Sequence, residues 1–173
     1  MLRLESFEED ALRLFEERID NSMTIPQEHF ARRYEGSEKP VPKGDVTMTI
    51  FKPVVLGVAS ANDPIFEDFK KPEAIGANYM LPNEWVEGAQ SVVSVFFPFT
   101  SEVCMSNREP GEASVEWQFA KYQGTKIIGE FCKLLCAELQ EQGWEAVMPV
   151  GSGRFSYSEE PCAYGEEQDF KAV

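Results

Sequence analysis

The sequence has few basic residues and no long apolar run. Only 16 lysines and arginines accompany 30 aspartates and glutamates among its 173 residues, so the formal net charge is −14. A surface with this charge repels phosphate backbones, and we expect no direct binding of nucleic acid by this chain. No stretch approaches the roughly 20 apolar residues that span a membrane, and residues 1–5 lack the apolar core of a signal peptide. We therefore expect a cytoplasmic protein without a membrane partner.

Histidine and cysteine, which bind many transition metals, are also scarce. The single histidine is His29, and the four cysteines are Cys104, Cys132, Cys136 and Cys162. They form no Cys-x-x-Cys motif of the kind that holds zinc or an iron–sulfur cluster. Cys132 and Cys136 lie one helical turn apart beside an apolar stripe, which favours a role as small apolar filler. We predict no metal site in this chain and a surface or packing role for His29.

The centre of the sequence predicts a strand, a helix and a second strand. Ser91–Phe97 is a β-branched and aromatic run, typical of a strand covered on both faces. After a polar loop at Thr100–Ala113, Ser114 can cap a long helix that Gly143 ends. Trp144–Val150 then predicts the second strand. This order indicates a right-handed β-α-β crossover, with the two strands parallel in one sheet.

The predicted helix carries an apolar stripe at spacings of three and four residues. Its members are Gly124, Ile127, Ile128, Phe131, Cys132, Leu135 and Leu139. Such a stripe faces the core. Gly124 within it has two interpretations: it allows close packing of the helix on the sheet, or it leaves space into which Tyr122 points. Tyr122 is correspondingly either amphipathic filler or part of a ligand site.

Residues 1–50 predict a helical N-terminal extension. An amphipathic helix is expected over Ser6–Ile19, and a second one begins at Thr24–Gln27 and ends near Tyr34. The alternating residues Val46–Ile50 predict a half-buried edge strand.

Residues 51–173 predict the α/β domain proper. Val54–Ala59 indicates another buried strand, and short helices are expected at Ile65–Phe69 and Pro82–Ala89. Together with the crossover, these segments predict an α/β fold with a mixed sheet and covering helices.

The segment after the second predicted strand is the candidate ligand site. Gly151–Ser158 is small, polar and aromatic, and ligands of open α/β sheets bind at the carboxyl ends of strands. It matches neither a dinucleotide fingerprint nor a P-loop, so a binding loop and a flexible connector are both consistent with it. The guanidinium of Arg154 suits a carboxylate or a phosphate. The candidate ligand-binding residues are Tyr122, Gly151, Ser152 and Arg154, and no catalytic residue is assigned.

Five motifs spread along the chain carry a resemblance to a known family. They are Asp63–Phe66, Pro82–Ala89, Val92–Phe99, Ser106–Arg108 and Glu116–Trp117. Through them, and from about Val54 to Phe155, the sequence resembles the N-terminal half of bacterial iron–sulfur proteins related to epoxyqueuosine reductase. The resemblance implies a corrinoid-binding-type N-terminal domain followed by a domain with two cysteine-rich [4Fe–4S] motifs. This chain stops before those cysteines, so the resemblance implies either a chain truncated before the iron–sulfur domain or a natural half-protein.

The resemblance also bears on cofactors and chemistry. It implies [4Fe–4S] clusters for the full-length family, with cobalamin as a further candidate cofactor. A corrinoid would lie at the carboxyl edge of the sheet, lined by Tyr122, Gly151, Ser152 and Arg154. Epoxyqueuosine reductases carry a catalytic aspartate on the strand that corresponds to Glu145–Val150. Pro149 or Val150 takes that place here, and neither transfers a proton, so the resemblance implies the architecture without the queuosine reaction.

Two functions from different classes follow as alternatives. The first is the N-terminal domain of an iron–sulfur- and corrinoid-linked redox protein, an oxidoreductase when full length, acting on an unidentified small molecule. The second is a non-catalytic domain that docks an iron–sulfur partner, its acidic surface selecting a basic one. A flavin-dependent nitroreductase-like enzyme is a third option, but the sequence has no basic cluster for a flavin phosphate.

Overall fold

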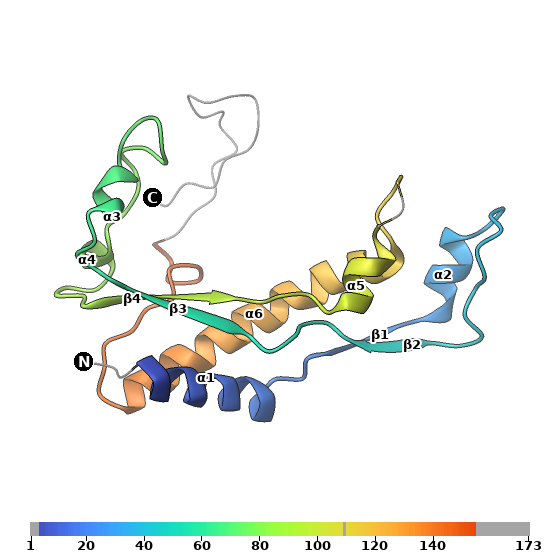
Figure 1. Ribbon diagram of the computed structural model, residues 1–173, viewed down its shortest axis with the longest axis horizontal. Helices are drawn as coiled ribbons and strands as arrows, with labels where there is room; N and C mark the ends of the chain where they lie inside the picture. Colours follow the sequence, from blue (N-terminus) through green and yellow to red (C-terminus); the bar gives the residue numbers. More distant parts are fainter. Residues whose placement is uncertain (1–3, 109, 155–173) are drawn as a thin grey trace. The chain divides into compact units, whose positions relative to one another are not determined.

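The computed structural model describes residues 4–108 and 110–154, with side chains from residue 7 onward. Ten helices and strands follow one another in this part of the chain (Figure 1). They are α1 (Leu4–Arg18), β1 (Ser22–Ile25), α2 (Gln27–Arg33), β2 (Val46–Thr49), β3 (Val55–Ser60), α3 (Ile65–Asp68), α4 (Pro82–Trp85), β4 (Ser91–Phe96), α5 (Ser101–Ser106) and α6 (Val115–Glu141). The fold is mixed α/β, with two small antiparallel sheets.

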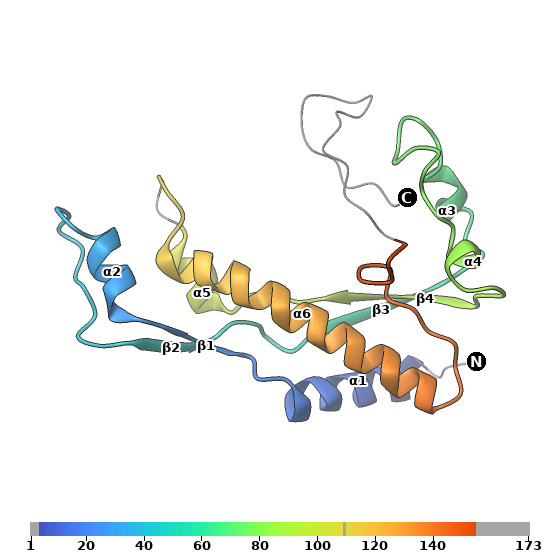
Figure 2. The ribbon, with the colours of Figure 1, turned by 180° about the vertical axis from the view of Figure 1, so that it is seen from behind.

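The chain divides into two compact units. Unit 1 contains the described residues of Met1–Leu56 and Val95–Cys132, and unit 2 contains those of Gly57–Ser94 and Lys133–Val173. The helix α6 and the strands β3 and β4 contribute residues to both. Figure 2 shows the ribbon from behind, with α6 running through the centre of the picture.

The N-terminal part of unit 1 largely follows its sequence pattern. The apolar face of α1 is buried through Phe7, Ala11, Phe15 and Ile19, as their spacing predicts. The helix α2 and the predicted edge strand β2 are confirmed, whereas β1 was not predicted. The strands β1 and β2 pair antiparallel from Ser22↔Thr49 to Ile25↔Val46. The segment 1–50 therefore contains a small sheet as well as its two helices.

The two ends of α6 confirm the sequence prediction. The Ser114 hydroxyl accepts the Trp117 N–H at 3.1 Å, which is an N-cap. At the other end Gly143 has φ +85°, and its N–H donates to the Gln140 carbonyl while that of Trp144 donates to the Leu139 carbonyl. These two bonds form a Schellman motif, which satisfies carbonyls that a helix end leaves free.

The buried face of α6 is close to the predicted stripe, with one error. The buried residues are Val115, Ala120, Gly124, Ile127, Phe131, Leu135 and Leu139. Ile128 is 37% exposed, so its place in the predicted stripe is wrong. A 3.6-residue period turns Ile128 by 100° from Ile127, and Ile127 takes the inward position.

The prediction of a strand over Trp144–Val150 is wrong. The structure assigns no strand to residues 144–150, and the described residues therefore form no β-α-β crossover with Ser91–Phe96. The Schellman motif turns the chain at Trp144, and the Gln140 side chain then binds the Ala146 carbonyl at 2.9 Å. Pro149 has no N–H for a ladder, and its carbonyl accepts the Ser152 N–H in a turn. Local bonds thus take up backbone groups that a strand would use.

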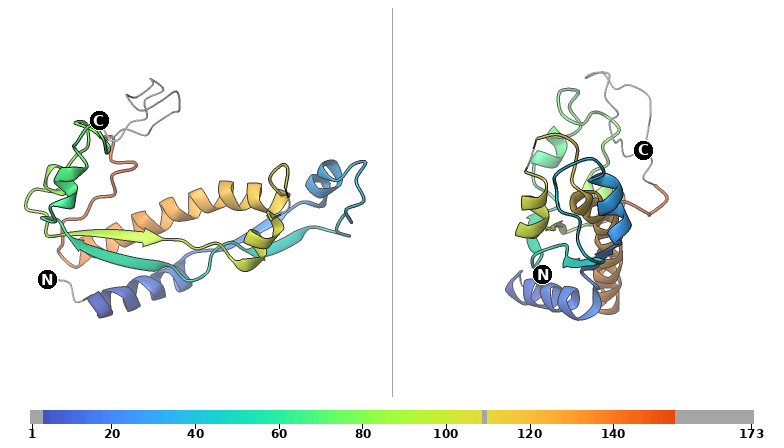
Figure 3. Two further views of the ribbon diagram at one scale, coloured as in Figure 1. Left: turned by 45° about the horizontal axis from the view of Figure 1, so that its top comes forward. Right: turned by 90° about the vertical axis from the view of Figure 1, so that its right-hand side faces the viewer.

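The strands β3 and β4 exist as predicted but are not buried on both faces. Within the described residues these two strands pair only with each other, antiparallel (Figure 3). At one end of the pair the Ala61 N–H donates to the Gln90 carbonyl. Most residues of β3 are exposed, and Phe96 in β4 is 64% exposed. An apolar run alone does not tell a buried strand from an uncovered one, which is why the sequence misled here.

The predicted loop Thr100–Ala113 contains the short helix α5. Thr100 accepts the Val103 N–H with its side chain and so caps this helix, and Val103 is fully buried. Among the described helices, none is both long enough and apolar enough to cross a membrane.

Candidate functional site

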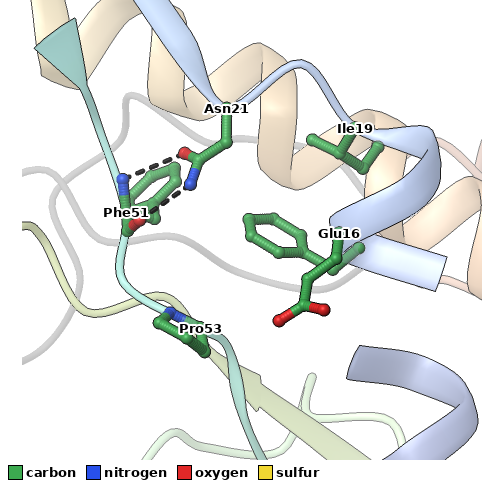
Figure 4. A pocket seen from close by; sticks show the side chains of 6 residues that line it. Glu16, Ile19, Asn21, Phe51 and Pro53 are labelled. Atoms are coloured by element: carbon green, nitrogen blue, oxygen red, sulfur yellow. Dashed lines mark hydrogen bonds between the residues drawn. The ribbon is translucent and has the colours of Figure 1, made fainter. Parts of the chain in front are cut away.

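An open hollow lies in unit 1 beside the carboxyl end of α1 (Figure 4). Its volume is about 220 Å³, and its lining residues are Phe15, Glu16, Ile19, Asn21, Phe51 and Pro53. The floor is apolar, because Phe15, Ile19 and Phe51 belong to the core. Among these lining residues Glu16 is the ionisable one, so the hollow offers apolar contact and a single carboxylate.

Asn21 builds one wall of this hollow. Its Nδ2 donates to the Phe51 carbonyl at 2.7 Å, and its Oδ1 accepts the Phe51 N–H at 2.9 Å, as the dashed lines of Figure 4 show. Its backbone carbonyl accepts the Ile50 N–H at 3.0 Å. The Asn21 side chain therefore takes the place of a paired strand residue just beyond the β1–β2 ladder. The Asn21 amide thus binds the Phe51 backbone and has a structural role, and the hollow lies beside this pair of hydrogen bonds.

The sequence pattern does not mark Asn21 as a functional or structural residue. The run Asp20-Asn21-Ser22 signals a turn, and the Asp20 carboxylate indeed accepts the Ser22 N–H and hydroxyl. The partner of Asn21 is 30 residues away, however, and no local pattern identifies it.

The candidate residue Tyr122 lies on the surface of α6. It is 68% exposed, and the Lys126 ammonium lies 4.2 Å from its ring centroid, a cation–π contact. Lys121 and Thr125 border the same shallow depression. Tyr122 therefore points to the surface and does not fill space beside Gly124.

Gly124 allows close packing, which confirms that interpretation of its place in the stripe. A Cβ built at Gly124 would lie 2.7 Å from Phe51 Cζ and 3.7 Å from Ile50 Cγ2. The Phe51 ring is held by Phe97 at 5.4 Å and by Phe99 at 5.1 Å between centroids. The ring cannot swing away freely, so the glycine is a steric requirement of α6 packing.

We expect Gly124→Ala to destabilise the protein by about 1 kcal/mol. Overpacking against Phe51 costs about 1–3 kcal/mol, and the better helix propensity of alanine returns about 1 kcal/mol. Gly129→Ala is the matched control on the same helix, because a Cβ at Gly129 would meet no atom within 4 Å. It should stabilise by about 0.5–1 kcal/mol. Urea denaturation measures both, and effects of the same sign would contradict this packing.

The other three candidate residues lie together in one turn of unit 2. The Pro149 carbonyl accepts both the N–H and the hydroxyl of Ser152, and the Ser152 hydroxyl accepts the Arg154 N–H. Gly151 and Gly153 have φ +91° and +76°, values that favour glycine. The structure thus brings Gly151, Ser152 and Arg154 together, while Tyr122 belongs to unit 1.

The Arg154 guanidinium is bound to the chain itself. Its Nη2 donates to the Glu84 carbonyl at 2.6 Å, its Nη1 donates to the Trp85 carbonyl at 3.3 Å, and it lies 5.0 Å from the Trp85 ring centroid. The neighbouring Glu84 carboxylate pairs with Lys70 at 2.8 Å and accepts the Leu81 N–H. The hydrogen bond from Lys70, then that from Leu81, hold the pKa of the Glu84 carboxyl below its usual value, with a smaller contribution from the charge of Arg154.

The described cysteines do not gather into a metal site. Cys104 is exposed on α5, and Cys132 and Cys136 are half-buried on α6, where burial raises the pKa of the Cys136 thiol. Cys162 lies outside the described residues. Within residues 4–108 and 110–154, no group of three His, Cys, Asp or Glu is arranged to hold a metal. His29 packs its ring against Phe119 at 4.9 Å, as a packing role predicts.

Comparison with known proteins adds no relative to these observations. The chain matches no family profile, no curated protein and no solved structure.

Proposed function

We propose that this chain is the cluster-free N-terminal part of an iron–sulfur redox system similar to epoxyqueuosine reductases. In this proposal the β3–β4 sheet packs against the polypeptide that carries the clusters. The observation that carries the proposal is this sheet, whose two strands contain neither a buried nor a charged residue.

The composition of the two strands supports a covered face. Val55 and Phe96 are 55% and 64% exposed, and Val58 of β3 is exposed as well. Proteins usually protect exposed strand edges with lysine, proline or a bulge. Val55–Ser60 and Ser91–Phe96 contain neither lysine nor proline, and a two-stranded sheet on its own is only marginally stable. A partner surface that covers this sheet would supply the missing burial.

The charge of the chain supports a basic partner. A net charge of −14 attracts a positively charged partner, which speeds its association with the chain, and it repels acidic proteins. The cluster-carrying polypeptide is either a continuation of the same protein or a separate redox partner. The proposal covers both forms, and it assigns the protein to the cytoplasm.

The implied cofactors fit this chain poorly. A [4Fe–4S] cluster needs thiolates that converge, and the described cysteines lie on two helices without forming such a group. For a corrinoid, the Arg154 guanidinium is already bound to two backbone carbonyls, and the Tyr122 ring is already covered by Lys126. We therefore derive no chemical step through either cofactor and assign the clusters to the partner polypeptide.

Capture from the native cell under anaerobic conditions tests the proposal. The tagged chain should co-purify with a protein that carries iron and sulfide and absorbs broadly at about 400 nm, as [4Fe–4S] clusters do. The chain alone, treated with iron and sulfide, should remain colourless. Phe96→Lys should reduce the captured iron by about tenfold, because it places a charge in a buried interface.

Met105→Lys is the matched control for Phe96→Lys. Met105 is 57% exposed and belongs to α5, not to either of the two strands. This variant should capture iron at the level of the unaltered chain. Cluster absorption from the chain alone, or equal capture by Phe96→Lys, would overturn the proposal.

A further inference from the structure

We propose that Arg154 is a latch that closes the 149–154 turn onto the carboxyl end of α4. The latch is built from residues of unit 2 alone and is independent of the proposed function. In this proposal Gly151, Ser152 and Arg154, the candidate ligand residues of this turn, hold the turn on α4 and do not bind a ligand.

The receiving side of the latch is the end of a helix. The last carbonyls of a helix have no partner within it, and an arginine close to them can donate to them. The carbonyls of Glu84 and Trp85 point to the guanidinium, which donates to them from two different nitrogens. A planar fork with separate donors suits two adjacent carbonyls, whereas the single ammonium of a lysine does not.

The Trp85 ring supports the same closure from a second direction. The guanidinium carbon lies 5.0 Å from the ring centroid, within the range of a cation–π contact. Trp85 itself is half-buried, so the closed latch covers part of its ring. Breaking the latch should therefore release both the turn and one face of this tryptophan.

The delivering side is a turn that holds its own shape. The Ser152 hydroxyl donates to the Pro149 carbonyl at 2.7 Å and accepts the Arg154 N–H at 3.2 Å. Gly151 and Gly153 supply the two positive φ angles that reverse the chain. A preformed turn loses less conformational entropy when Arg154 binds α4, which favours the closed state.

The receiving helix also makes contacts that do not involve Arg154. The Glu84 carboxylate accepts the Leu81 N–H at 2.6 Å and pairs with Lys70. Arg154 donates to the carbonyl of Glu84 and does not need its carboxylate. The charge of Glu84 therefore contributes little to the binding of Arg154, and a variant that removes only this charge tests the point directly.

Trypsin cleavage after position 154 measures the open state. When opening is fast, the cleavage rate follows the population of the open form. Arg154→Lys keeps the charge and the cleavage site but loses the forked pair of hydrogen bonds. In the native protein, we expect this variant to be cleaved after position 154 about tenfold faster than the unaltered chain. Rates are normalised to the same site in the urea-unfolded chain, with cleavage after the exposed Lys43 as an internal reference.

Two further variants separate the latch from simple loss of structure. Glu84→Gln keeps both carbonyls and should stay within about twofold of the unaltered protein. Trp85→Leu removes the ring but keeps the backbone, and should give an intermediate increase of about threefold. Equal protection of Arg154→Lys and the unaltered protein would overturn the latch. So would Glu84→Gln that is cleaved as fast as Arg154→Lys, since the carboxylate would then hold the turn.

Discussion

Phe131→Ala should lower the free energy of unfolding by about 3–5 kcal/mol. Phe131 is fully buried in unit 1. Its ring meets Phe15 at 5.5 Å and Phe97 at 5.6 Å, both edge to face, and these two rings meet each other at 6.0 Å. Alanine would remove one ring from a closed group of three and leave a cavity, because the backbones of α1, α6 and the Phe97 segment cannot all move inward.

The size of this effect is large for a domain of this kind. Total stabilities are typically about 5–15 kcal/mol, so the variant loses a substantial part of the whole. Urea denaturation followed by the helical circular dichroism signal measures it. The denaturation midpoint should fall, and the slope should remain the same if the denatured state is unchanged.

Two controls on α6 show whether the effect belongs to the buried face. Glu141→Ala alters an exposed residue in the last turn and should cost less than about 0.5 kcal/mol. Ile128→Ala removes a side chain that the sequence pattern places inside and the structure places partly outside. It should cost about 1 kcal/mol, well below Phe131→Ala. Equal costs for Ile128 and Phe131 would mean that the helix faces are misassigned.

Local signals predicted most of the secondary structure. The caps of α6 depend on Ser114 and Gly143, and both act within a few residues of their own position. The burial of Phe7, Ala11, Phe15 and Ile19 follows from helical periodicity alone. Such features require no knowledge of which segments meet in space.

The errors concern strands and what covers them. Trp144–Val150 has the composition of a strand, but no neighbouring strand pairs with it in the described part of the chain. Val55–Ser60 and Ser91–Phe96 do pair, yet remain largely uncovered. Pairing and coverage are long-range properties, and β propensity reports only how well a residue suits a pleated surface.

The candidate site shows the same division. The sequence made Arg154 a candidate anion ligand, because a guanidinium suits a carboxylate or a phosphate. In the structure it binds the carbonyls of Trp85 and Glu84, which come 69 and 70 positions earlier in the chain. The sequence indicates the donor and gives no sign of the acceptor. The same holds for Asn21, because β1, α2 and β2 separate it in the chain from its partner Phe51.

Asn21→Ala should lower the free energy of unfolding by about 2–4 kcal/mol. The change leaves the N–H and the carbonyl of Phe51 without their partner, and each buried group that loses its bond costs about 1–3 kcal/mol. Phe51 is only 2% exposed, so water reaches these groups mainly through the adjoining hollow. Urea denaturation measures the loss. A cost below about 1 kcal/mol would mean that water replaces the amide efficiently.

Asn21→Asp tests the two bonds separately through pH. An ionised aspartate can accept the Phe51 N–H but places a second oxygen against the Phe51 carbonyl, where Asn21 Nδ2 donates at 2.7 Å. A protonated aspartate can make both bonds, one as donor and one as acceptor. The pKa of this carboxyl should therefore be raised in the folded state above its unfolded value of about 3.9. The loss of stability caused by the ionised aspartate is then fully present above the pKa of the folded state. It is relieved as the pH falls towards the pKa of the unfolded state.

The comparison of Asn21→Asp with Asn21→Ala isolates this behaviour from the general effect of acid. At pH 7 the aspartate variant should be at least as unstable as the alanine variant. As the pH falls towards about 4, the aspartate variant should become the more stable of the two, since only it can restore the pair of bonds. A difference between them that stays constant with pH would show that the Asn21 amide does not donate to the Phe51 carbonyl. The role of Asn21 as a substitute strand partner would then be lost, and with it the account of how α1 connects to the β1–β2 sheet.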